Sequence, residues 1–146
     1  MDYYSNAEDQ LQSANILSEA GKYRTPVTLL CLACELFLKS LAEYKIPDSP
    51  LMESHDVIAL GEALREEIDF KRLRPYLNTI RKYHNDSRYP FDPKVYTKEF
   101  YGELLQIVLV VKSEIDKVNA SKSTRQALEE KFGKDKVIDT SKEERK

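Results

Sequence analysis

The stretch VTLLCLACELFLKSLAEY, residues 27–44, decides the fold of this 146-residue chain. From Leu29 to Leu38 it is apolar almost all the way round a helix, which is typical of a helix enclosed by others. A Thr-Pro pair directly before it suits the first turn of a helix, and two prolines shortly after it end the helical stretch. We therefore predict that this helix is the central and most buried one.

Two charged residues and two cysteines interrupt the apolar run. Glu35 and Lys39 are four residues apart, a spacing at which opposite charges pair on a helix. Cys31 and Cys34 form a C-x-x-C motif, which can indicate a redox or zinc site. A thioredoxin-like site requires a strand before the motif, and the sequence predicts none there. A zinc site needs further ligands, and only two histidines are available. We predict that both cysteines are buried, unpaired and metal-free, in a reduced, cytoplasmic protein.

Apolar residues recur every three or four positions in four further stretches, which predicts four more helices. The first covers residues 6–20, with Ser5 in a capping box and Gly21 as the stop signal. Ser54 is the expected cap of the second. The inward-facing residues of these two helices are Ala7, Leu11, Ala14 and Leu17, and Val57, Leu60 and Leu64.

The two remaining helices are expected over residues 75–86 and, after a cap at Thr97, up to Val118. Pro75 is expected to interrupt the helical stretch before it, because proline removes a backbone hydrogen bond. The inward-facing residues are Leu73, Leu77, Ile80 and His84 or Tyr83, and Phe100, Leu104, Ile107, Val108, Val111, Ile115 and Val118.

The pattern predicts an all-α fold, an antiparallel up-and-down bundle of four to five helices over residues 1–118. Residues 119–146 are rich in charged and small polar residues, so we expect a charged extension with a short helix at Ser123–Phe132 and a disordered end. The N-terminus does not resemble a signal peptide, and the apolar runs fall short of the roughly 20 residues that span a bilayer. The apolar surface of the central and last helices exceeds what four short helices can cover, which predicts a homodimer.

The residues best suited to bind a ligand follow the helix over residues 75–86. Arg81, His84, Asn85 and Arg88 recur at helical spacing, and Tyr89 comes next. Arginine binds phosphate through a rigid fork of donors, histidine contacts phosphate near neutral pH, and tyrosine stacks on bases. These five residues form a candidate nucleotide- or RNA-binding site, and neither a cofactor nor a metal is predicted.

A purely structural interpretation of this cluster remains open. Arg81 and Arg88 then lie on a solvated face, Arg88 pairs with a nearby carboxylate, and His84 interacts with carbonyl groups at the helix end. His55 and Asp56, neighbours at the start of a helix, do not face each other, so they too are interpreted as structural. The chain has a net charge of -2, which provides no general attraction for nucleic acid, and it lacks a P-loop, a dinucleotide-binding glycine motif and a zinc-protease motif.

Four segments in order resemble the HEPN family, helical domains of prokaryotes and higher eukaryotes linked to nucleotide binding. They are GKY at residues 21–23, CELFLKSL at 34–41, SHDV at 54–57 and SRYP at 87–90. The resemblance covers residues 7–118. It implies a bundle of four main helices that often pairs as a homodimer. Many members are ribonucleases of toxin–antitoxin systems, and others accompany a small nucleotidyltransferase partner.

The resemblance to the ribonuclease members implies a signature in which four to six residues separate an arginine from the histidine that follows it. This chain departs from that signature. Two residues separate Arg81 from His84, and nine separate Arg74 from it. We therefore expect a nucleotide- or RNA-binding module without the usual ribonuclease motif. One alternative is a non-catalytic interaction module of a two-protein system. The other is an atypical metal-independent ribonuclease that uses His84 with Arg88.

Overall fold

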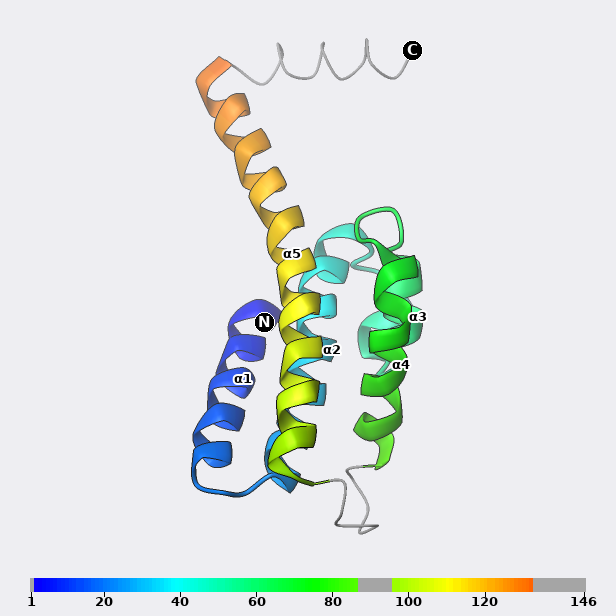
Figure 1. Ribbon diagram of the computed structural model, residues 1–146. Coiled ribbons are helices and arrows are strands. Elements are labelled where there is room, and N and C mark those ends of the chain that lie inside the picture. The colour runs from blue at the N-terminus through cyan, green and yellow to red at the C-terminus, as the bar shows by residue number, and fades with distance from the viewer. Residues whose placement is uncertain (1, 87–95, 133–146) are drawn as a thin grey trace. The chain divides into compact units, whose positions relative to one another are not determined.

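Every regular element in residues 2–86 and 96–132, the part of the chain that the computed structural model describes, is helical. The elements are α1 (Tyr3–Glu19), α2 (Arg24–Lys45), the 3-10 helix η1 (Pro50–Glu53), α3 (Val57–Ala63), α4 (Phe70–Asp86) and α5 (Lys98–Phe132) (Figure 1). The all-α prediction is confirmed.

The chain divides into two compact units, residues 1–115 and residues 116–146. The first unit holds α1 to α4 and the part of α5 that ends at Ile115. The second unit begins with the remainder of α5, which is helical to Phe132. The end predicted to be disordered, Thr140–Lys146, lies outside the described residues.

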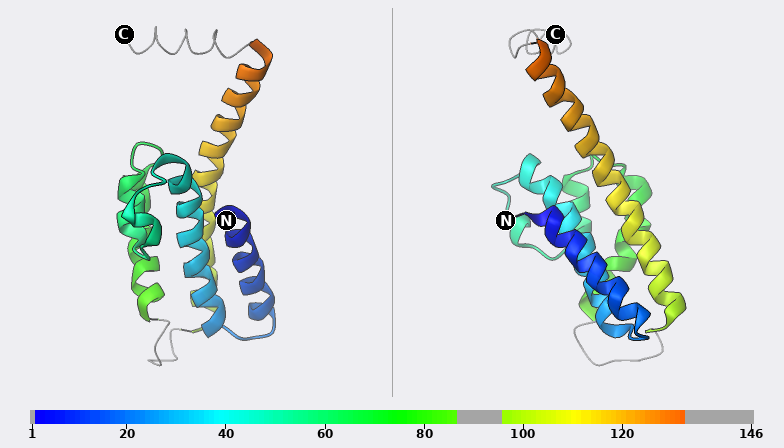
Figure 2. Two further views of the ribbon diagram at one scale, coloured as in Figure 1. Left: turned by 180° about the vertical axis from the view of Figure 1, so that it is seen from behind. Right: turned by 90° about the vertical axis from the view of Figure 1, so that its left-hand side faces the viewer.

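Helix α2 occupies the middle of the first unit, with α1 on one side and α3 and α4 on the other (Figures 1 and 2). It is long and apolar enough to cross a bilayer, and 67% of its most apolar window is buried inside the protein. Its burial among the other helices accounts for its composition, because an enclosed helix needs apolar residues on every side. The predicted central helix is confirmed.

The start of α1 differs from the prediction, while its end agrees. Asp2, not Ser5, is the cap: its carboxylate accepts the Ser5 backbone N–H at 3.1 Å and the Ser5 hydroxyl at 2.8 Å. A carboxylate is a strong acceptor for the unpaired N–H groups of a first turn, so the helix starts earlier. Gly21 has a φ of 77° and follows the last turn, where a residue without a Cβ adopts the left-handed conformation easily.

The α3 and α4 boundaries also differ from the prediction. Asp56, not Ser54, caps α3, because its carboxylate accepts the N–H groups of Ile58 and Ala59. Helix α4 begins at Phe70 and continues through Pro75. Pro75 lies on the exposed face of α4, where water can bond to the carbonyl group that the missing proline N–H leaves without a partner.

Side chains join α5 to α1 and α4 within the first unit. Tyr101 donates a hydrogen bond to Asn15 of α1, and Phe100 packs edge-on against Tyr83 of α4 with the ring centroids 4.6 Å apart. Thr97 caps α5 as predicted, since its hydroxyl accepts the Phe100 N–H at 3.1 Å. These contacts place the apolar face of α5 on the core.

The apolar stripe of α5 does not require a second chain to cover it. Leu104, Val108, Val111 and Ile115 are fully buried within one chain, as are the apolar residues at the centre of α2. The large hydrophobic side chains that are exposed in the described residues are Ile16, Tyr44, Tyr76 and Leu109. Phe100, Ile107 and Val118 of the predicted stripe are partly exposed, and the homodimer stays a prediction.

Both cysteines are fully buried and form no disulfide, as predicted. Burial raises the pKa of the Cys31 thiol to about 12. Burial, and then the nearby Cys31 and Glu35, raise the pKa of the Cys34 thiol well above its ordinary value. Neither sulfur is therefore present as the reactive thiolate at neutral pH.

We predict that a thiol reagent labels the native protein far more slowly than the denatured protein, which a timed colorimetric assay measures. Replacing either cysteine by alanine should lower the free energy of unfolding by about 1 kcal/mol, since a small apolar volume is lost from the core. Rapid labelling of one thiol in the native protein would contradict the buried, protonated state.

Candidate functional site

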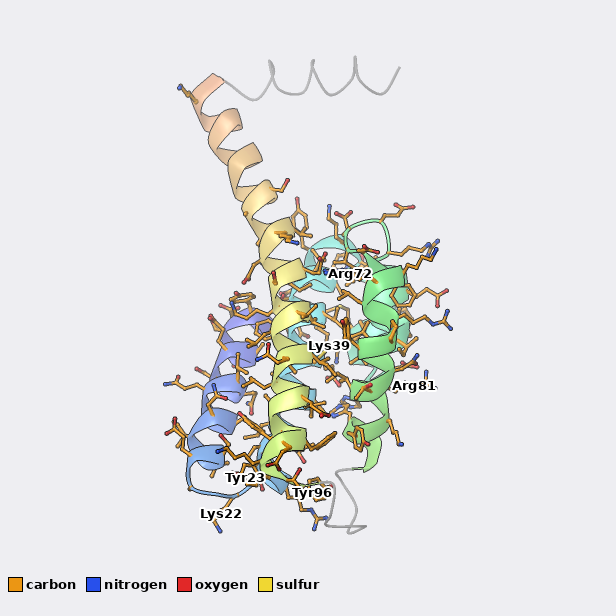
Figure 3. All side chains as sticks on the ribbon, in the orientation of Figure 1. Lys22, Tyr23, Lys39, Arg72, Arg81 and Tyr96 are labelled. Atoms are coloured by element: carbon orange, nitrogen blue, oxygen red, sulfur yellow. The ribbon has the colours of Figure 1, made fainter. Side chains whose placement is uncertain are left out.

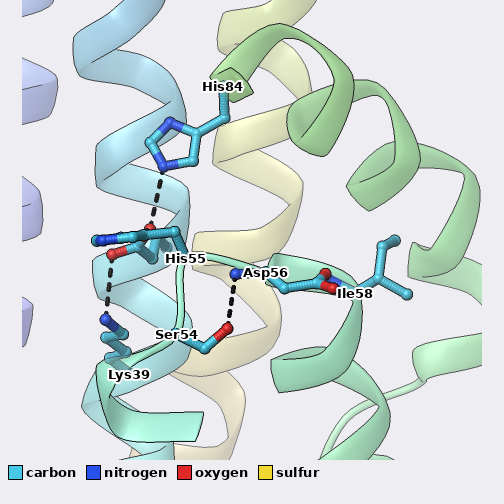
Figure 4. Close-up of polar contacts among 7 residues, drawn as sticks. Lys39, Ser54, His55, Asp56, Ile58 and His84 are labelled. Atoms are coloured by element: carbon cyan, nitrogen blue, oxygen red, sulfur yellow. Dashed lines mark hydrogen bonds and ion pairs between the residues drawn. The ribbon is translucent and has the colours of Figure 1, made fainter. Parts of the chain in front are cut away.

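The Glu35 carboxylate, buried in the middle of α2, accepts bonds from three side chains (Figure 4). The Lys39 ammonium lies 3.2 Å from Oε2. His55 Nδ1 and His84 Nε2 each lie 3.0 Å from Oε1. Glu35 is 2% exposed, and these three contacts replace the water that burial removes.

Helical spacing aligns two of the donors with Glu35. Lys39 is one turn along α2, and its pairing with Glu35 confirms the interaction predicted from the four-residue spacing. His84 continues the inner stripe of α4, in line with the fully buried Leu77 and Ile80. An imidazole at this position therefore points at α2.

The third donor comes from the segment between η1 and α3. The Ser54 hydroxyl accepts the Asp56 N–H at 3.0 Å, and Asp56 caps α3 (Figure 4). These two bonds fix the backbone on either side of His55. Its ring then reaches the Glu35 carboxylate on α2, 20 positions earlier in the chain.

The contacts around Glu35 keep it ionised. Burial by itself raises the pKa of the Glu35 carboxyl, because a low-dielectric surrounding disfavours the charged form. The hydrogen bonds from the two histidines and the nearby Lys39 ammonium outweigh burial and lower the pKa from 4.5 to about 2. The carboxylate and the ammonium thus form a buried ion pair.

The carboxylate also determines which histidine nitrogens carry a proton. An ionised carboxylate only accepts hydrogen bonds, so His55 Nδ1 and His84 Nε2 both donate N–H groups. The His84 ring is buried, whereas the His55 side chain is 59% exposed. The two rings lie edge to face, with centroids 6.2 Å apart, so His55 extends the buried cluster to the surface.

Arg81 lies on the surface beside this cluster. Its side chain is 51% exposed on α4 (Figure 3), and Nη1 lies 3.9 Å from Asp56 Oδ1. Asp56 directly follows His55 in the chain, so the guanidinium group contacts the sequence neighbour of the residue that carries the exposed imidazole. Both groups are able to contact a negatively charged ligand.

The predicted site residues take different positions. Arg81 is exposed, as a ligand contact requires, whereas His84 is 4% exposed and donates from Nε2 to Glu35. His84 therefore does not share the exposed face of α4 with Arg81, because the apolar spacing of α4 directs it inward. The Asn85 side chain lies outside the described residues, as do Arg88 and Tyr89.

Glu35, Lys39 and His55 belong to the cluster but were not among the site residues predicted from the sequence. A signal was present, since a glutamate and a lysine in the most apolar helix need polar partners in the core. The chain has only two histidines, and both supply such a partner. The two histidines follow Glu35 by 20 and 49 residues, and no helix or strand periodicity relates positions that far apart.

The fold and the comparisons with known proteins define the class of this protein. Residues 1–118 match the HEPN domain family, so the chain belongs to the HEPN family. No curated protein and no solved structure matches the chain. Family membership supports a module with a general relation to nucleotides or RNA.

We predict that Glu35→Gln lowers the free energy of unfolding at pH 7 by about 3–5 kcal/mol, because the buried Lys39 loses its counter-charge. The folded-state pKa of Glu35 is about 2 and its ordinary value is 4.5, so the stability it contributes is complete above pH 4.5. About 3 kcal/mol of this stability should be lost as the pH falls from about 4.5 towards 2.

Urea unfolding of both proteins across this pH range measures the effect. Glu62→Gln, on the exposed surface of α3, is the matched control and should change stability by less than about 0.5 kcal/mol. Equal acid sensitivity of the wild type and Glu35→Gln would show that Glu35 does not titrate as described.

Proposed function

We propose that this HEPN module binds a nucleotide or RNA through its phosphate groups, at the surface where α4 lies beside the segment between η1 and α3. The supporting observation is the exposed Arg81 guanidinium, which faces Asp56, the residue that directly follows the exposed His55. The proposed site also includes Asn85, Arg88 and Tyr89, which follow Arg81 in the chain. His84 is assigned an indirect role, since it helps to hold the Glu35 carboxylate that orients His55.

The local charge supports this proposal. The chain has a net charge of -2, so attraction for a polyanion has to come from a local group of cations. Arg81 faces Asp56 at 3.9 Å, and both side chains are about half exposed. A solvated pair of this kind is weak, so a phosphate with two acceptor oxygens can displace Asp56 from the guanidinium group.

A second candidate function is a non-catalytic interaction module of a two-protein system, such as one with a nucleotidyltransferase partner. It is favoured by the position of His84, because a histidine buried against Glu35 serves the packing of the bundle. The proposal includes pairing of two chains, which is common in the HEPN family. An atypical ribonuclease that uses His84 with Arg88 is disfavoured, since His84 Nε2 donates to Glu35.

We predict that Arg81→Ala weakens binding of a short RNA or a nucleotide about tenfold or more, since a hydrogen bond to a charged group contributes about 1.5–3 kcal/mol. Calorimetric titrations at several salt concentrations measure the change. The slope of log affinity against log salt should fall by about one, because one phosphate contact is lost.

Arg74→Ala is the matched control, because Arg74 is exposed and lies two turns earlier on α4. It removes the same charge from the same helix, about 10 Å from Arg81, and should leave affinity nearly unchanged. Equal losses in both variants would indicate a general charge effect. If the wild type binds no nucleotide or RNA, the interaction-module function takes its place.

We further predict that the purified protein cleaves RNA little or not at all, because the arginine–histidine spacing of the family's ribonucleases is absent and His84 is buried. Electrophoresis of a labelled RNA incubated with the protein tests this. Cleavage that persists through purification and disappears in His84→Ala, with the fold retained by circular dichroism, would establish the atypical ribonuclease.

A further inference from the structure

We propose that Glu35, His55 and His84 form a binding site for a divalent transition-metal ion of the zinc type. The three residues come from α2, from the segment before α3 and from α4. Their ligand atoms, Glu35 Oε1, His55 Nδ1 and His84 Nε2, all lie within 4.8 Å of one another. The site shares His55 with the phosphate-binding surface proposed above but does not include Arg81, so the two proposals can be tested separately.

The donor set fits such an ion. Two imidazole nitrogens and one carboxylate oxygen are a recurrent three-ligand set for zinc, with water in the fourth position. Imidazole favours zinc, copper, nickel and iron over magnesium or calcium, which prefer oxygen ligands. Both histidines of the chain contribute to the set, so no histidine is used elsewhere.

The geometry needs one small adjustment. A tetrahedral zinc ion with bonds of about 2.0–2.2 Å separates its ligand atoms by roughly 3.3–3.5 Å. Glu35 Oε1 is already 3.0 Å from each ligating nitrogen. The two imidazoles come to the required separation by rotation of His55, whose side chain is 59% exposed. The buried Glu35 Oε1 and His84 Nε2 need to move apart by only roughly 0.3–0.5 Å.

The remaining contacts of the site are compatible with an ion. Lys39 binds Glu35 Oε2, so it orients the carboxylate and leaves Oε1 as the single ligating oxygen. On metal binding, each imidazole carries its proton on the other ring nitrogen, and the ion replaces two hydrogen bonds. The exposed side of His55 lets water reach the fourth position. Because Lys39 already neutralises Glu35, affinity depends mainly on the two imidazoles.

Cobalt titration of the untagged protein tests the site, since an affinity tag would add histidines. We expect one Co²⁺ per chain, a visible absorption band typical of a tetrahedral ion, and displacement of Co²⁺ by Zn²⁺. A sulfur-to-cobalt band in the near ultraviolet should be absent, because Cys31 and Cys34 are not ligands. His55→Ala should lower the affinity by roughly 100-fold, since one of three protein ligands is lost.

Glu53→Gln is the matched control, because Glu53 is an exposed carboxylate two positions from His55 and outside the ligand set. It should bind Co²⁺ as the wild type does, and so should Arg81→Ala, which separates this test from that of phosphate binding. His55 is exposed, so circular dichroism should show an intact fold in His55→Ala. A wild type without a cobalt band, or equal affinity in His55→Ala, would overturn the metal site.

Discussion

The bonds to the Glu35 carboxylate are the interaction on which the rest of the bundle depends. An ionised carboxylate in a protein interior is unstable unless opposite charge and hydrogen-bond donors replace its hydration. Glu35 obtains them from Lys39 on its own helix and from the two histidines. The elements that carry the two histidines must therefore keep a fixed position along α2. A shift of α4 by one residue would rotate His84 by about 100° and remove it from the carboxylate.

The same bonds connect the core with the surface that we assign to function. His84 is held inside, while His55 has one ring nitrogen on the buried carboxylate and most of its side chain exposed. Arg81 contacts Asp56, which directly follows His55 in the chain. A ligand at this surface would thus meet groups whose orientation is set by a buried ion pair. HEPN membership gives the general relation to nucleotides or RNA.

Most of the fold was predictable because helices depend on local patterns. The central helix, the Gly21 stop and the Thr97 cap all follow from spacing and backbone chemistry within a few residues. The errors arose where two local signals competed. Asp2 and Ser5 both suit a helix start, and in the structure Asp2 is the cap. A proline usually ends a helix, but Pro75 lies on the exposed face, where water can bond to the carbonyl group left without a partner.

The sequence by itself determined the helical class, the enclosed α2, the buried cysteines and the Glu35–Lys39 pair, because each depends on residues within a few turns of one helix. It also placed His84 among the inward-facing candidates of α4. Only the tertiary structure decided that both histidines meet Glu35, since contacts across 20 and 49 positions depend on how three elements pack. Such packing is set by the balance of apolar burial against polar desolvation over the whole bundle, and no short stretch of sequence records that balance.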